Sequence, residues 1–384
     1  MNICKHNDFC GGCIYQGMGY EEQLHIKNAE VLKLIEEKGI ACENYFGIEG
    51  SPAIYGYRNK MEYTFGDMVK DGEMTLGMHQ KGRFMSIVTV DECQLVDSDY
   101  NLILAGTLGF CNEKEYKHYH KKNHTGFLRN LIIRKGERTK ELLINLVTSS
   151  ERELDAEDFV EMLKQLNLEN KIVGIVQTIN DGVADFVYCD RLKVLDGQDY
   201  YSEIIMGLKF KVSAFSFFQT NVEAVERLYT EALALIDDFS GKTVYDLYCG
   251  TGTITQTLAL KAKRAIGVEI VEEAVAAARV NAEMNQLDNC EFIAGDVFQV
   301  LDGIQDKPDV IVVDPPRVGI HPKALEKIVS YGVPQILYIS CNPKTLTDNL
   351  KYISYYGYKV KSMKAYDNFP NTKHIECVCL IEKK

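Results

Sequence analysis

Hydrophobic and polar positions follow two different rhythms along the chain. Between residues 20 and 38, apolar residues recur at helical spacing, and Gly39 ends the predicted helix. From about residue 52 to 215, short apolar runs are separated by Gly and Asp turns, which predicts a mainly antiparallel sheet domain with one helix near 155–166. Its predicted strands include 61–65, 74–78, 84–90, 128–134 and 142–148.

A helix is expected at about 221–237. After Gly241 the hydrophobic pattern changes, and predicted strands alternate with helical segments such as 272–285 and 323–329. The predicted strands are 243–247, 264–269, 290–294, 310–314, 336–341, 359–366 and 374–381. This alternation predicts an α/β fold with a doubly wound sheet, and the last two strands should form a hairpin at one edge. We therefore expect a Cys-rich segment with a helix (1–50), a central antiparallel-sheet domain (51–215) and an α/β domain (216–384).

Composition narrows the class of protein. A chain of 384 residues suits two or three domains. No apolar run reaches the roughly 18–20 residues of a membrane span, and no signal-peptide pattern opens the chain, so we expect a cytoplasmic protein without membrane association. Its net charge of −12 argues against indiscriminate binding to nucleic acid. In a reducing compartment the twelve cysteines should be thiols, metal ligands or catalysts.

One segment departs from the acidic average. Residues 114–140 contain nine Lys or Arg against two Asp or Glu, with His118, His120 and His124 among them. Such a basic surface could hold RNA phosphates. An equally good interpretation makes 117–124 a solvated loop.

A strand that runs into a glycine-rich turn predicts a nucleoside pocket. Residues 244–253 read Val-Tyr-Asp-Leu-Tyr-Cys-Gly-Thr-Gly-Thr, and glycines let a backbone approach a ligand closely. A nicotinamide-binding fold competes, but Thr255 stands where its third glycine belongs. The next strands end near Glu269, suited to ribose hydroxyls, and Asp296, suited to an adenine edge. Carboxylates at successive strand ends favour a nucleoside without phosphates, such as S-adenosylmethionine, although each alone could be an ordinary turn residue.

Two loops on the same predicted edge carry candidate chemistry. Asp-Pro-Pro-Arg at 314–317 follows the fourth strand, and Arg317 replaces the aromatic residue that would suggest methylation of an amino nitrogen. Cys341 ends the fifth strand. A thiolate that adds to carbon 6 of uracil turns carbon 5 into a carbanion equivalent, which can accept a methyl group. A buried structural thiol is the competing interpretation of Cys341.

The uracil scheme also needs a base that removes the proton left on carbon 5. Glu376 and His374 are both candidates because the two-residue period of a strand places them on one face. Either could instead be a polar residue at the edge of a terminal strand. The aromatic stretch 215–218, followed by Gln219 and Asn221, could stack on a base taken out of its helix or belong to the core.

The N-terminal cysteines predict a metal or iron–sulfur site. Cys4, Cys10 and Cys13 form a tight set, and Cys93 is the expected fourth ligand. Four thiolates suit zinc or an iron–sulfur cluster. Zinc sites usually pair two short Cys-x-x-Cys hooks, so the three-plus-one spacing favours the cluster.

These motifs and their order resemble the bacterial RNA uracil-C5 methyltransferases, in particular the iron–sulfur enzymes that act on 23S rRNA. The resemblance covers nearly the whole chain and rests on the Cys-x5-Cys-Gly-Gly-Cys start and on residues 58–60, 216–221, 246–250, 314–317, 340–342 and 369–376. It implies a C-terminal Rossmann-like class I methyltransferase domain, preceded by an α+β RNA-binding domain and a short iron–sulfur segment.

The resemblance also implies roles for single residues. Cys341 matches the nucleophile, and Glu376 rather than His374 matches the base. The S-adenosylmethionine site would be lined by Gln219, Tyr248, Thr253, Glu269, Asp296 and Asp314, the last of which would also touch the uracil. The ligands of a [4Fe-4S] cluster would be Cys4, Cys10, Cys13 and Cys93. The implied protein is a monomeric 23S rRNA (uracil-5-)-methyltransferase that binds RNA and not DNA.

Many family members begin with an extra RNA-binding barrel, which this chain is expected to lack. RNA contacts would then come from the cluster region and the sheet domain. A tRNA uridine or a cytosine carbon 5 is an alternative target, although cytosine enzymes have different cysteine motifs. A non-catalytic RNA-binding protein that keeps S-adenosylmethionine binding is the third hypothesis, and the intact pair Cys341 and Glu376 speaks against it.

Overall fold

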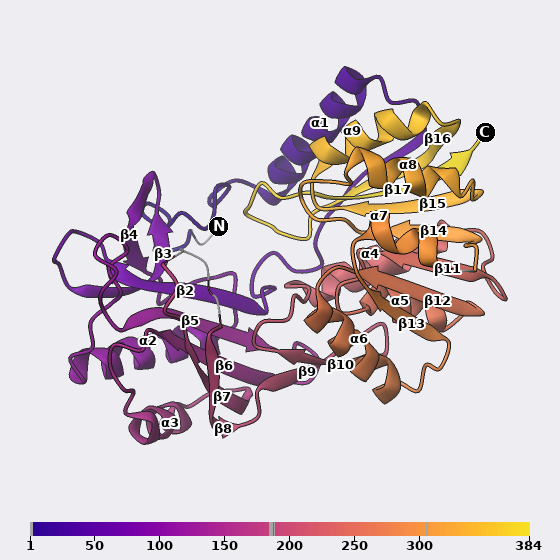
Figure 1. Ribbon diagram of the computed structural model, residues 1–384. Coiled ribbons are helices and arrows are strands. Elements are labelled where there is room, and N and C mark those ends of the chain that lie inside the picture. Colours follow the sequence, from indigo (N-terminus) through magenta and orange to yellow (C-terminus); the bar gives the residue numbers. More distant parts are fainter. Residues whose placement is uncertain (1–2, 184–186, 188, 305) are drawn as a thin grey trace. The chain divides into compact units, whose positions relative to one another are not determined.

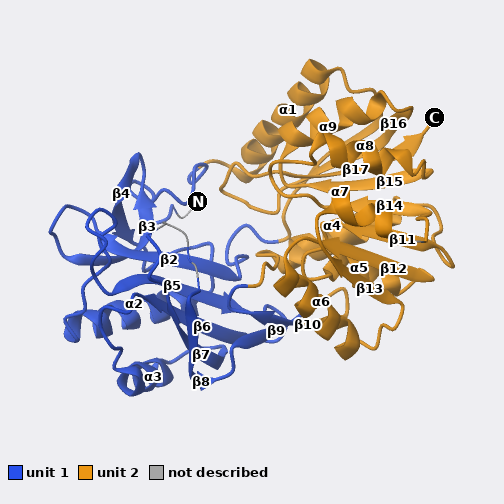
Figure 2. Ribbon diagram, viewed as in Figure 1, with its two compact units in different colours: residues 1–17, 53–204, 211–215 blue, residues 18–52, 205–210, 216–384 orange. Residues whose placement is uncertain are grey.

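The chain folds into two compact units (Figures 1 and 2). The structure, a computed structural model, describes residues 3–183, 187, 189–304 and 306–384. Unit 1 comprises Met1–Gly17, Ala53–Ile204 and Lys211–Phe215, and unit 2 comprises Met18–Pro52, Ile205–Phe210 and Ser216–Lys384. This division differs from the expected parts 1–50, 51–215 and 216–384, because residues 18–52 pack with unit 2.

Unit 1 is built on a seven-stranded sheet in the order β4-β3-β2-β5-β6-β7-β8. Its strands are β2 (Lys60–Asp67), β3 (Met74–Gln80), β4 (Arg83–Thr89), β5 (Leu128–Lys135), β6 (Glu141–Thr148), β7 (Lys171–Ile179) and β8 (Arg191–Gly197). Neighbouring strands are antiparallel except β6 and β7, which are joined through helix α3 (Ala156–Gln165). The expected mainly antiparallel domain is confirmed.

Helix α2 (Ser98–Glu113) of unit 1 was missing from the predicted elements. Its Tyr100 joins Phe159 of α3 and Leu131 of the sheet in one buried core. The helix is apolar on both its buried and its exposed sides, as the exposed Leu102 shows, so no single-face helical period marks it in the sequence.

Unit 2 contains an eight-stranded sheet in the order β1-β16-β17-β15-β14-β11-β12-β13. Its strands are β1 (Cys42–Glu49), β11 (Thr243–Leu247), β12 (Arg264–Glu269), β13 (Cys290–Ala294), β14 (Val310–Val313), β15 (Gln335–Ser340), β16 (Tyr358–Tyr366) and β17 (Glu376–Lys383). Its helices are α1 (Tyr20–Lys38), α4 (Val222–Ala234), α5 (Thr253–Ala259), α6 (Glu272–Met284), α7 (Val297–Val300), α8 (Pro322–Ser330) and α9 (Pro343–Ser354), with a 3-10 turn at Leu301–Gly303. Strand and helix alternate, which confirms the doubly wound, Rossmann-like fold.

The C-terminal hairpin lies inside this sheet rather than at its edge. Strand β17 is antiparallel to both β15 and β16, as a hairpin requires. Beyond it, β1 pairs in parallel with β16, so that Cys42 lies opposite Val360. Gly47, with a φ of 76°, and an irregularity between Tyr45 and Ile48 interrupt the alternation of β1, which explains why the sequence pattern did not predict this strand.

Helices of unit 2 pack against the sheet in separate groups. Val31 of α1, Leu325 of α8 and Leu350 of α9 share one buried core with the sheet, and Figure 1 shows these three helices grouped together. Helix α6 packs in another cluster, where Ala278 meets Phe292 of β13. A two-stranded sheet of β9 (Tyr200–Ile205) and β10 (Leu208–Ser213) contains two of the points where the chain passes from one unit to the other.

Candidate active site

The carboxyl ends of the parallel strands of unit 2 lie at one edge of the sheet. There, Tyr248 follows β11, Glu269 ends β12, Asp296 follows β13, Asp314 follows β14 and Cys341 follows β15. The sheet order turns around between β11 and β14, and ligands of doubly wound sheets bind at such a switch point. Five of the predicted site residues are therefore brought to the same edge.

The turn after β11 needs glycine at two positions. Gly250 and Gly252 have positive φ angles of 54° and 79°. A Cβ at Gly252 would lie 2.6 Å from a ring carbon of Phe292, so a larger residue does not fit. The Gly250 N–H donates to Glu269 Oε2 at 3.0 Å and fixes the turn to the end of β12. Tyr248 also has a left-handed backbone, with a φ of 69°, a strained conformation that is common at functional sites.

Tyr248 is affected by the charges of both Asp296 and Glu269. Burial, with contributions from the charges of Asp296 and Glu269, raises the pKa of the Tyr248 hydroxyl to about 12. Glu269 Oε1 accepts a hydrogen bond from the Val271 N–H at 3.0 Å, and Asp296 accepts one from the Phe298 N–H at 2.9 Å. Because an ionised carboxylate has about four acceptor sites, both groups can still accept hydrogen bonds from a bound nucleoside.

Gln219 and Thr253, two further predicted cofactor residues, also belong to unit 2. Thr253 is the buried first residue of α5. Gln219 donates from Nε2 to the hydroxyl of Tyr229 at 3.1 Å. Burial, and next the charge of Asp314, raises the pKa of Tyr229, so this hydroxyl links Gln219 to the site. Tyr229 was not predicted because it lies in an apolar helical pattern that indicates an ordinary core residue.

Asp246, near the end of β11, is 0% exposed. Its Oδ2 accepts a hydrogen bond from Thr255 Oγ1 at 2.5 Å, whereas Oδ1 has no hydrogen-bond partner among the described residues. Burial raises the pKa of this carboxyl to about 7. The hydrogen bond from Thr255 lowers this pKa, and the charge of Asp314 raises it. A buried acid with an unsatisfied oxygen fits a ligand that carries a positive charge or a donor group, since such a ligand would favour the ionised form.

Cys341 and Glu376 come together through the antiparallel pairing of β15 and β17. Ser340, the last residue of β15, lies opposite Cys377, so the next facing positions are Cys341 and Glu376. Cys341 also precedes Asn342, the N-cap of α9. A helix N-terminus favours negative charge close by.

The charged groups around Cys341 act in opposite directions on its thiol. Burial raises the pKa of the Cys341 thiol to about 11, and the charges of Glu376 and Asp314 contribute to the rise. Arg317 opposes them by its charge and by a hydrogen bond to the thiolate. A thiol with this pKa is protonated in the free protein at neutral pH.

The two carboxyl groups near Cys341 have pKa values raised towards neutral pH. Burial raises the pKa of Glu376 to about 8, with Asp314 adding to the rise and Arg317 opposing it. Burial also raises the pKa of Asp314 to about 7. Carboxyl groups of this kind are suited to general acid–base catalysis.

His374 does not share a strand face with Glu376, contrary to the two-residue pattern. Strand β17 begins at Glu376, and His374 lies in the loop before it. Its Nδ1 is 2.5 Å from a guanidinium nitrogen of Arg317, and its ring stands edge-on to Phe369 at 6.0 Å. His374 therefore contacts Arg317, while Glu376 is the group that interacts with Cys341.

Helix α1 holds the loop that leads to Glu376. Lys27 donates to Asp367 Oδ1 at 2.6 Å and to the Phe369 carbonyl at 3.2 Å, and both side chains of the ion pair are 0% exposed. Gln23 accepts from the Asn371 N–H at 2.8 Å and donates to Asn371 Oδ1 at 3.2 Å. Asn371 has a φ of 66°, so two hydrogen bonds hold a strained residue in place.

The four N-terminal candidate ligands gather in unit 1. Burial raises the pKa of the Cys13 thiol to about 12, and the charges of Cys93, Cys10 and Cys4 contribute. Cys93 is likewise raised, to about 11, mainly by burial. The Gly12 N–H donates to Cys10 Sγ at 3.3 Å. Within residues 3–183, 187, 189–304 and 306–384, however, no three His, Cys, Asp or Glu side chains are arranged as a metal site.

Most cations of the predicted basic segment have structural partners. Lys114 pairs with Asp155 at 3.5 Å, and Lys135 is buried between Asp97 and Glu137 at 2.9 and 2.8 Å. The segment 114–140 thus presents fewer cations to solvent than its composition indicates. Its exposed cations are Lys117, Lys122, Arg138 and Lys140, and Lys121 is partly exposed.

In the aromatic stretch 215–218, one ring packs in the core and another is exposed to solvent. Phe218 is buried and packs on Phe210 at 5.8 Å between ring centroids. Phe217 is 73% exposed, so its ring is available for contact with a ligand.

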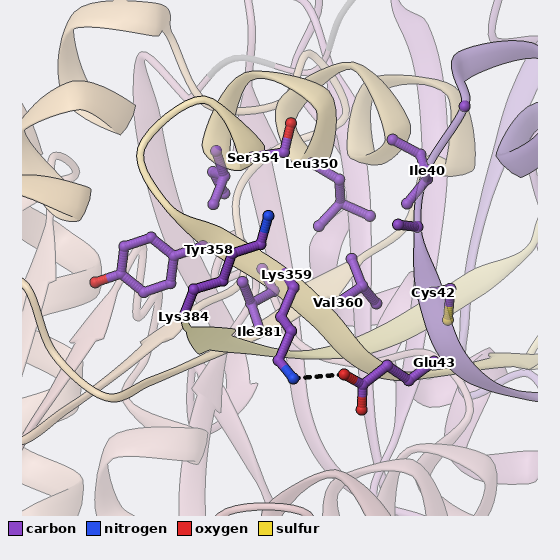
Figure 3. A pocket seen from close by; sticks show the side chains of 13 residues that line it. Ile40, Cys42, Glu43, Leu350, Ser354, Tyr358, Lys359, Val360, Ile381 and Lys384 are labelled. Atoms are coloured by element: carbon purple, nitrogen blue, oxygen red, sulfur yellow. Dashed lines mark hydrogen bonds and ion pairs between the residues drawn. The ribbon is translucent and has the colours of Figure 1, made fainter.

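A cavity of about 420 Å³ lies away from these residues (Figure 3). It is lined by Cys42 at the start of β1, Tyr358 at the start of β16 and Ile381 near the end of β17. These positions are at the end of the sheet opposite to Cys341, and a Lys359–Glu43 ion pair at 2.5 Å lies beside them. The predicted site residues do not line it.

Of the helices that the structure describes, none combines the length and apolar character needed to cross a lipid bilayer.

Comparisons with known proteins agree on one family. The sequence model of the family described as "tRNA (Uracil-5-)-methyltransferase" matches residues 20–384. An uncharacterized RNA methyltransferase of Clostridium tetani is 49% identical over 375 residues, which cover 98% of this chain and 82% of the relative. A second one, from Clostridium acetobutylicum, is 49% identical over 381 residues, which cover 99% and 84%.

A solved structure has a similar fold over nearly the whole chain. The Pyrococcus abyssi tRNA (uracil-54, C5)-methyltransferase, in complex with S-adenosyl-L-homocysteine, superimposes with a TM-score of 0.80 at 26% sequence identity. The match covers 97% of this chain and 84% of the other.

Proposed function

Because the chain belongs to the tRNA (uracil-5-)-methyltransferase family, we propose that it methylates carbon 5 of a uridine in RNA with S-adenosylmethionine as methyl donor. The observation that carries this proposal is the juxtaposition of Cys341 and Glu376 at the sheet edge where the acidic strand ends meet. A thiol nucleophile beside a carboxyl group that titrates near neutral pH is the pair that this reaction needs.

Cys341 starts the reaction by losing its thiol proton to solvent and forming a bond from its sulfur to carbon 6 of the uracil. The electron pair of the 5,6 double bond moves to carbon 5 and the neighbouring carbonyl, and carbon 5 then forms its bond to the methyl carbon while the methyl–sulfur bond of the donor breaks. Arg317 supports the first step because its charge and hydrogen bond favour the thiolate.

Glu376 ends the reaction as the base. Its carboxylate takes the proton from carbon 5, the 5,6 double bond re-forms, and the sulfur of Cys341 leaves carbon 6. The raised pKa of Glu376, about 8, makes the carboxylate a stronger base than an exposed glutamate. The charge of Asp314 acts on both Cys341 and Glu376, and we propose that Asp314 contacts the uracil ring.

The proposed donor site lies at the carboxyl ends of β11 to β14. Tyr248, Glu269 and Asp296 would contact its nucleoside part, and Gln219 and Thr253 would complete the wall. S-adenosylmethionine supplies an electrophilic methyl group on a positively charged sulfur. The buried carboxyl of Asp246, with its unsatisfied Oδ1, fits a cationic ligand of this kind.

We also propose that Cys4, Cys10, Cys13 and Cys93 hold a [4Fe-4S] cluster. The support is the spacing of Cys4, Cys10 and Cys13 in the sequence, together with Cys93, which belongs to the same unit 1. Among the described residues, no three His, Cys, Asp or Glu side chains are arranged as a metal site, so the proposal depends on the cysteine spacing and is tested by the metal content of the purified protein.

The proposed target is 23S rRNA, on the strength of the N-terminal cysteines and the motif order. The test is mass-spectrometric mapping of 5-methyluridine in 23S rRNA and tRNA from cells with and without the gene. Loss at a 23S position supports the proposal. An unchanged modification pattern, together with no methyl transfer in vitro to unmodified RNA, would contradict it.

A tRNA uridine is the second candidate target. The name of the matching family and the solved tRNA methyltransferase structure favour it. In the same mapping experiment, loss of 5-methyluridine from tRNA alone would select this target and leave the chemistry of Cys341 and Glu376 unchanged.

A further inference from the structure

An exposed aromatic residue, Phe84, stands on the edge of the sheet of unit 1. Phe84 is 64% exposed, and its neighbour Met85 is 48% exposed. Its ring stacks on His79 of β3 with 4.7 Å between centroids and 6° between the planes. Exposed stacked rings of this kind present a flat apolar platform to solvent.

Strand β4 is irregular where it presents Phe84. His79 pairs with Ile87, but the next residue of β3, Gln80, pairs with Arg83, so residues 84–86 have no counterpart on β3. Strand β4 also forms the edge of the sheet. Bulged edge strands turn side chains out of the regular pleat, and they are frequent next to functional sites.

Two cations lie at this platform. The Lys121 ammonium, from the loop 117–124, lies over the Phe84 ring at 5.0 Å from its centre. Arg83 precedes Phe84 and is exposed. A chain with a net charge of −12 thus concentrates positive charge beside an exposed ring.

The cysteine-rich segment packs against the same hairpin. The Gly11 N–H donates to the His79 carbonyl at 2.9 Å, and the Lys81 N–H donates to the Phe9 carbonyl at 2.8 Å. Cys10 forms an isolated bridge with Gln80. The backbone under the platform is therefore held by residues 9–11.

We propose that His79, Arg83, Phe84, Met85 and Lys121, here called the Phe84 surface, bind an unpaired stretch of the RNA substrate. Because His79 is stacked on the Phe84 ring, an unstacked base would stack on the other face in place of the Lys121 ammonium. Lys121 would then contact an adjoining phosphate, as would Arg83. Paired RNA hides its bases, so a stacking platform selects single-stranded or looped RNA. This inference rests on the proposed function and names the form of RNA that unit 1 binds.

Fluorescence anisotropy with a fluorescein-labelled single-stranded oligouridine and the full-length protein tests the proposal. Phe84→Ala should weaken binding by roughly five- to 150-fold, the range for loss of one base–aromatic stack. Phe84→Tyr keeps a ring and should bind as the wild type does. Lys121→Gln should reduce the slope of log affinity against log salt by about 0.7, as expected for one lost contact to a single strand.

Tyr355→Ala is the matched control. Tyr355 is 72% exposed, and Lys351 lies over its ring at 6.0 Å, but both belong to unit 2. The control should bind the oligouridine like the wild type. Equal loss in Phe84→Ala and Tyr355→Ala, unchanged binding in Phe84→Ala, or equal competition by an oligouridine–oligoadenosine duplex would each overturn the proposal. If Phe84→Ala fails to fold by circular dichroism, the Lys121→Gln salt slope decides, and an unchanged slope would overturn the proposal.

Methyl transfer to unmodified RNA is measured with the same protein. If RNA binding depends on Phe84 but the wild type transfers no methyl group, the proposed function would be contradicted, whereas the proposal for the Phe84 surface would still hold. Methyl transfer by the wild type, with oligouridine binding that does not depend on Phe84, would overturn the surface alone.

Discussion

Cys341 faces Glu376 because Ser340 and Cys377 are partners in the antiparallel pairing of β15 and β17. The two side chains therefore lie close together only if β15 and β17 keep this register. A slip of one residue would move every side chain of β17 to the other face of the sheet. The buried pairing on both sides of β17, with β15 and β16, protects the site against such a slip.

Replacement of Cys341 tests the proposed nucleophile. Cys341→Ala should abolish methyl transfer, because carbon 5 of uracil is too weak a nucleophile without addition at carbon 6. RNA that contains 5-fluorouridine should form a stable adduct with the wild type, since fluorine replaces the proton that the base removes. Denaturing gel electrophoresis should show this adduct for the wild type and for Cys42→Ala, which lies at the other end of the sheet, but not for Cys341→Ala. A Cys341→Ala enzyme that still methylates would defeat the assignment.

Replacement of Glu376 should have two opposite effects. Methyl transfer in Glu376→Gln should fall by about 10²–10⁴-fold, the usual contribution of a general base, and the methylated adduct should accumulate. At the same time the pKa of Cys341 should fall, because the Glu376 charge raises it. Cys341 should therefore react faster with iodoacetamide, followed by peptide mass spectrometry at several pH values. The control is Glu382→Gln near the far end of β17. Equal alkylation rates in the wild type and Glu376→Gln would contradict the predicted interaction.

Asp246 makes the stability of the ligand-free protein depend on pH. Its folded-state pKa of about 7 lies above the value of an exposed aspartate, so folding favours the protonated form. The stabilising contribution is complete below the unfolded-state pKa near 4 and is lost as pH rises through about 7. Asp246→Asn should therefore raise the melting temperature relative to the wild type at pH 8, by roughly 2–4 °C per kcal/mol regained, and less at pH 5. The exposed Asp288→Asn should change neither value. An Asp246→Asn protein that melts below the wild type at pH 8 would refute the argument.

The sequence pattern predicted those features that depend on local periodicity. The helix 20–38 and the strands 243–247, 264–269 and 290–294 have the predicted bounds, because their apolar residues repeat with a clear period. Helix α2 and strand β1 have no such period. Their structure depends on packing against distant residues, as in the pairing of β1 with β16.

The candidate site shows the same limit. Strand ends predicted the edge at which Glu269, Asp296 and Cys341 meet, since parallel strands share a direction. Periodicity alone made Glu376 and His374 equally good candidates for the base. In the structure only Glu376 belongs to β17, which begins at this residue. The oxygen of Asp246 that lacks a hydrogen-bond partner could not be predicted, because it results from the burial of the side chain, which local sequence patterns do not indicate.

Iron content tests the proposed cluster. Anaerobically purified protein should be brown and contain about four irons per chain, as for one [4Fe-4S] cluster. Cys93→Ser should lose the colour and the iron, because serine is a poor ligand for a cluster built on thiolates. Cys111→Ser, a buried cysteine of helix α2, serves as a control that should keep both. Colourless protein with one equivalent of zinc would instead support a zinc site.

The buried pair Lys27–Asp367 links residues 340 positions apart, and we expect it to stabilise the loop before Glu376. Burial lowers the pKa of Lys27 and raises that of Asp367, in both cases against their mutual attraction. Lys27→Ala would leave Asp367 buried without its partner, at a cost of about 3–5 kcal/mol in the free energy of unfolding. Lys27→Met combined with Asp367→Asn should recover much of the loss, because no buried charge remains. Urea unfolding at pH 7 measures both.

Lys33→Ala, on the same helix, removes an exposed 3.7 Å pair with Glu37 and should cost at most about 0.5 kcal/mol. A Lys27→Ala protein as stable as Lys33→Ala would show that the pair does not hold the loop.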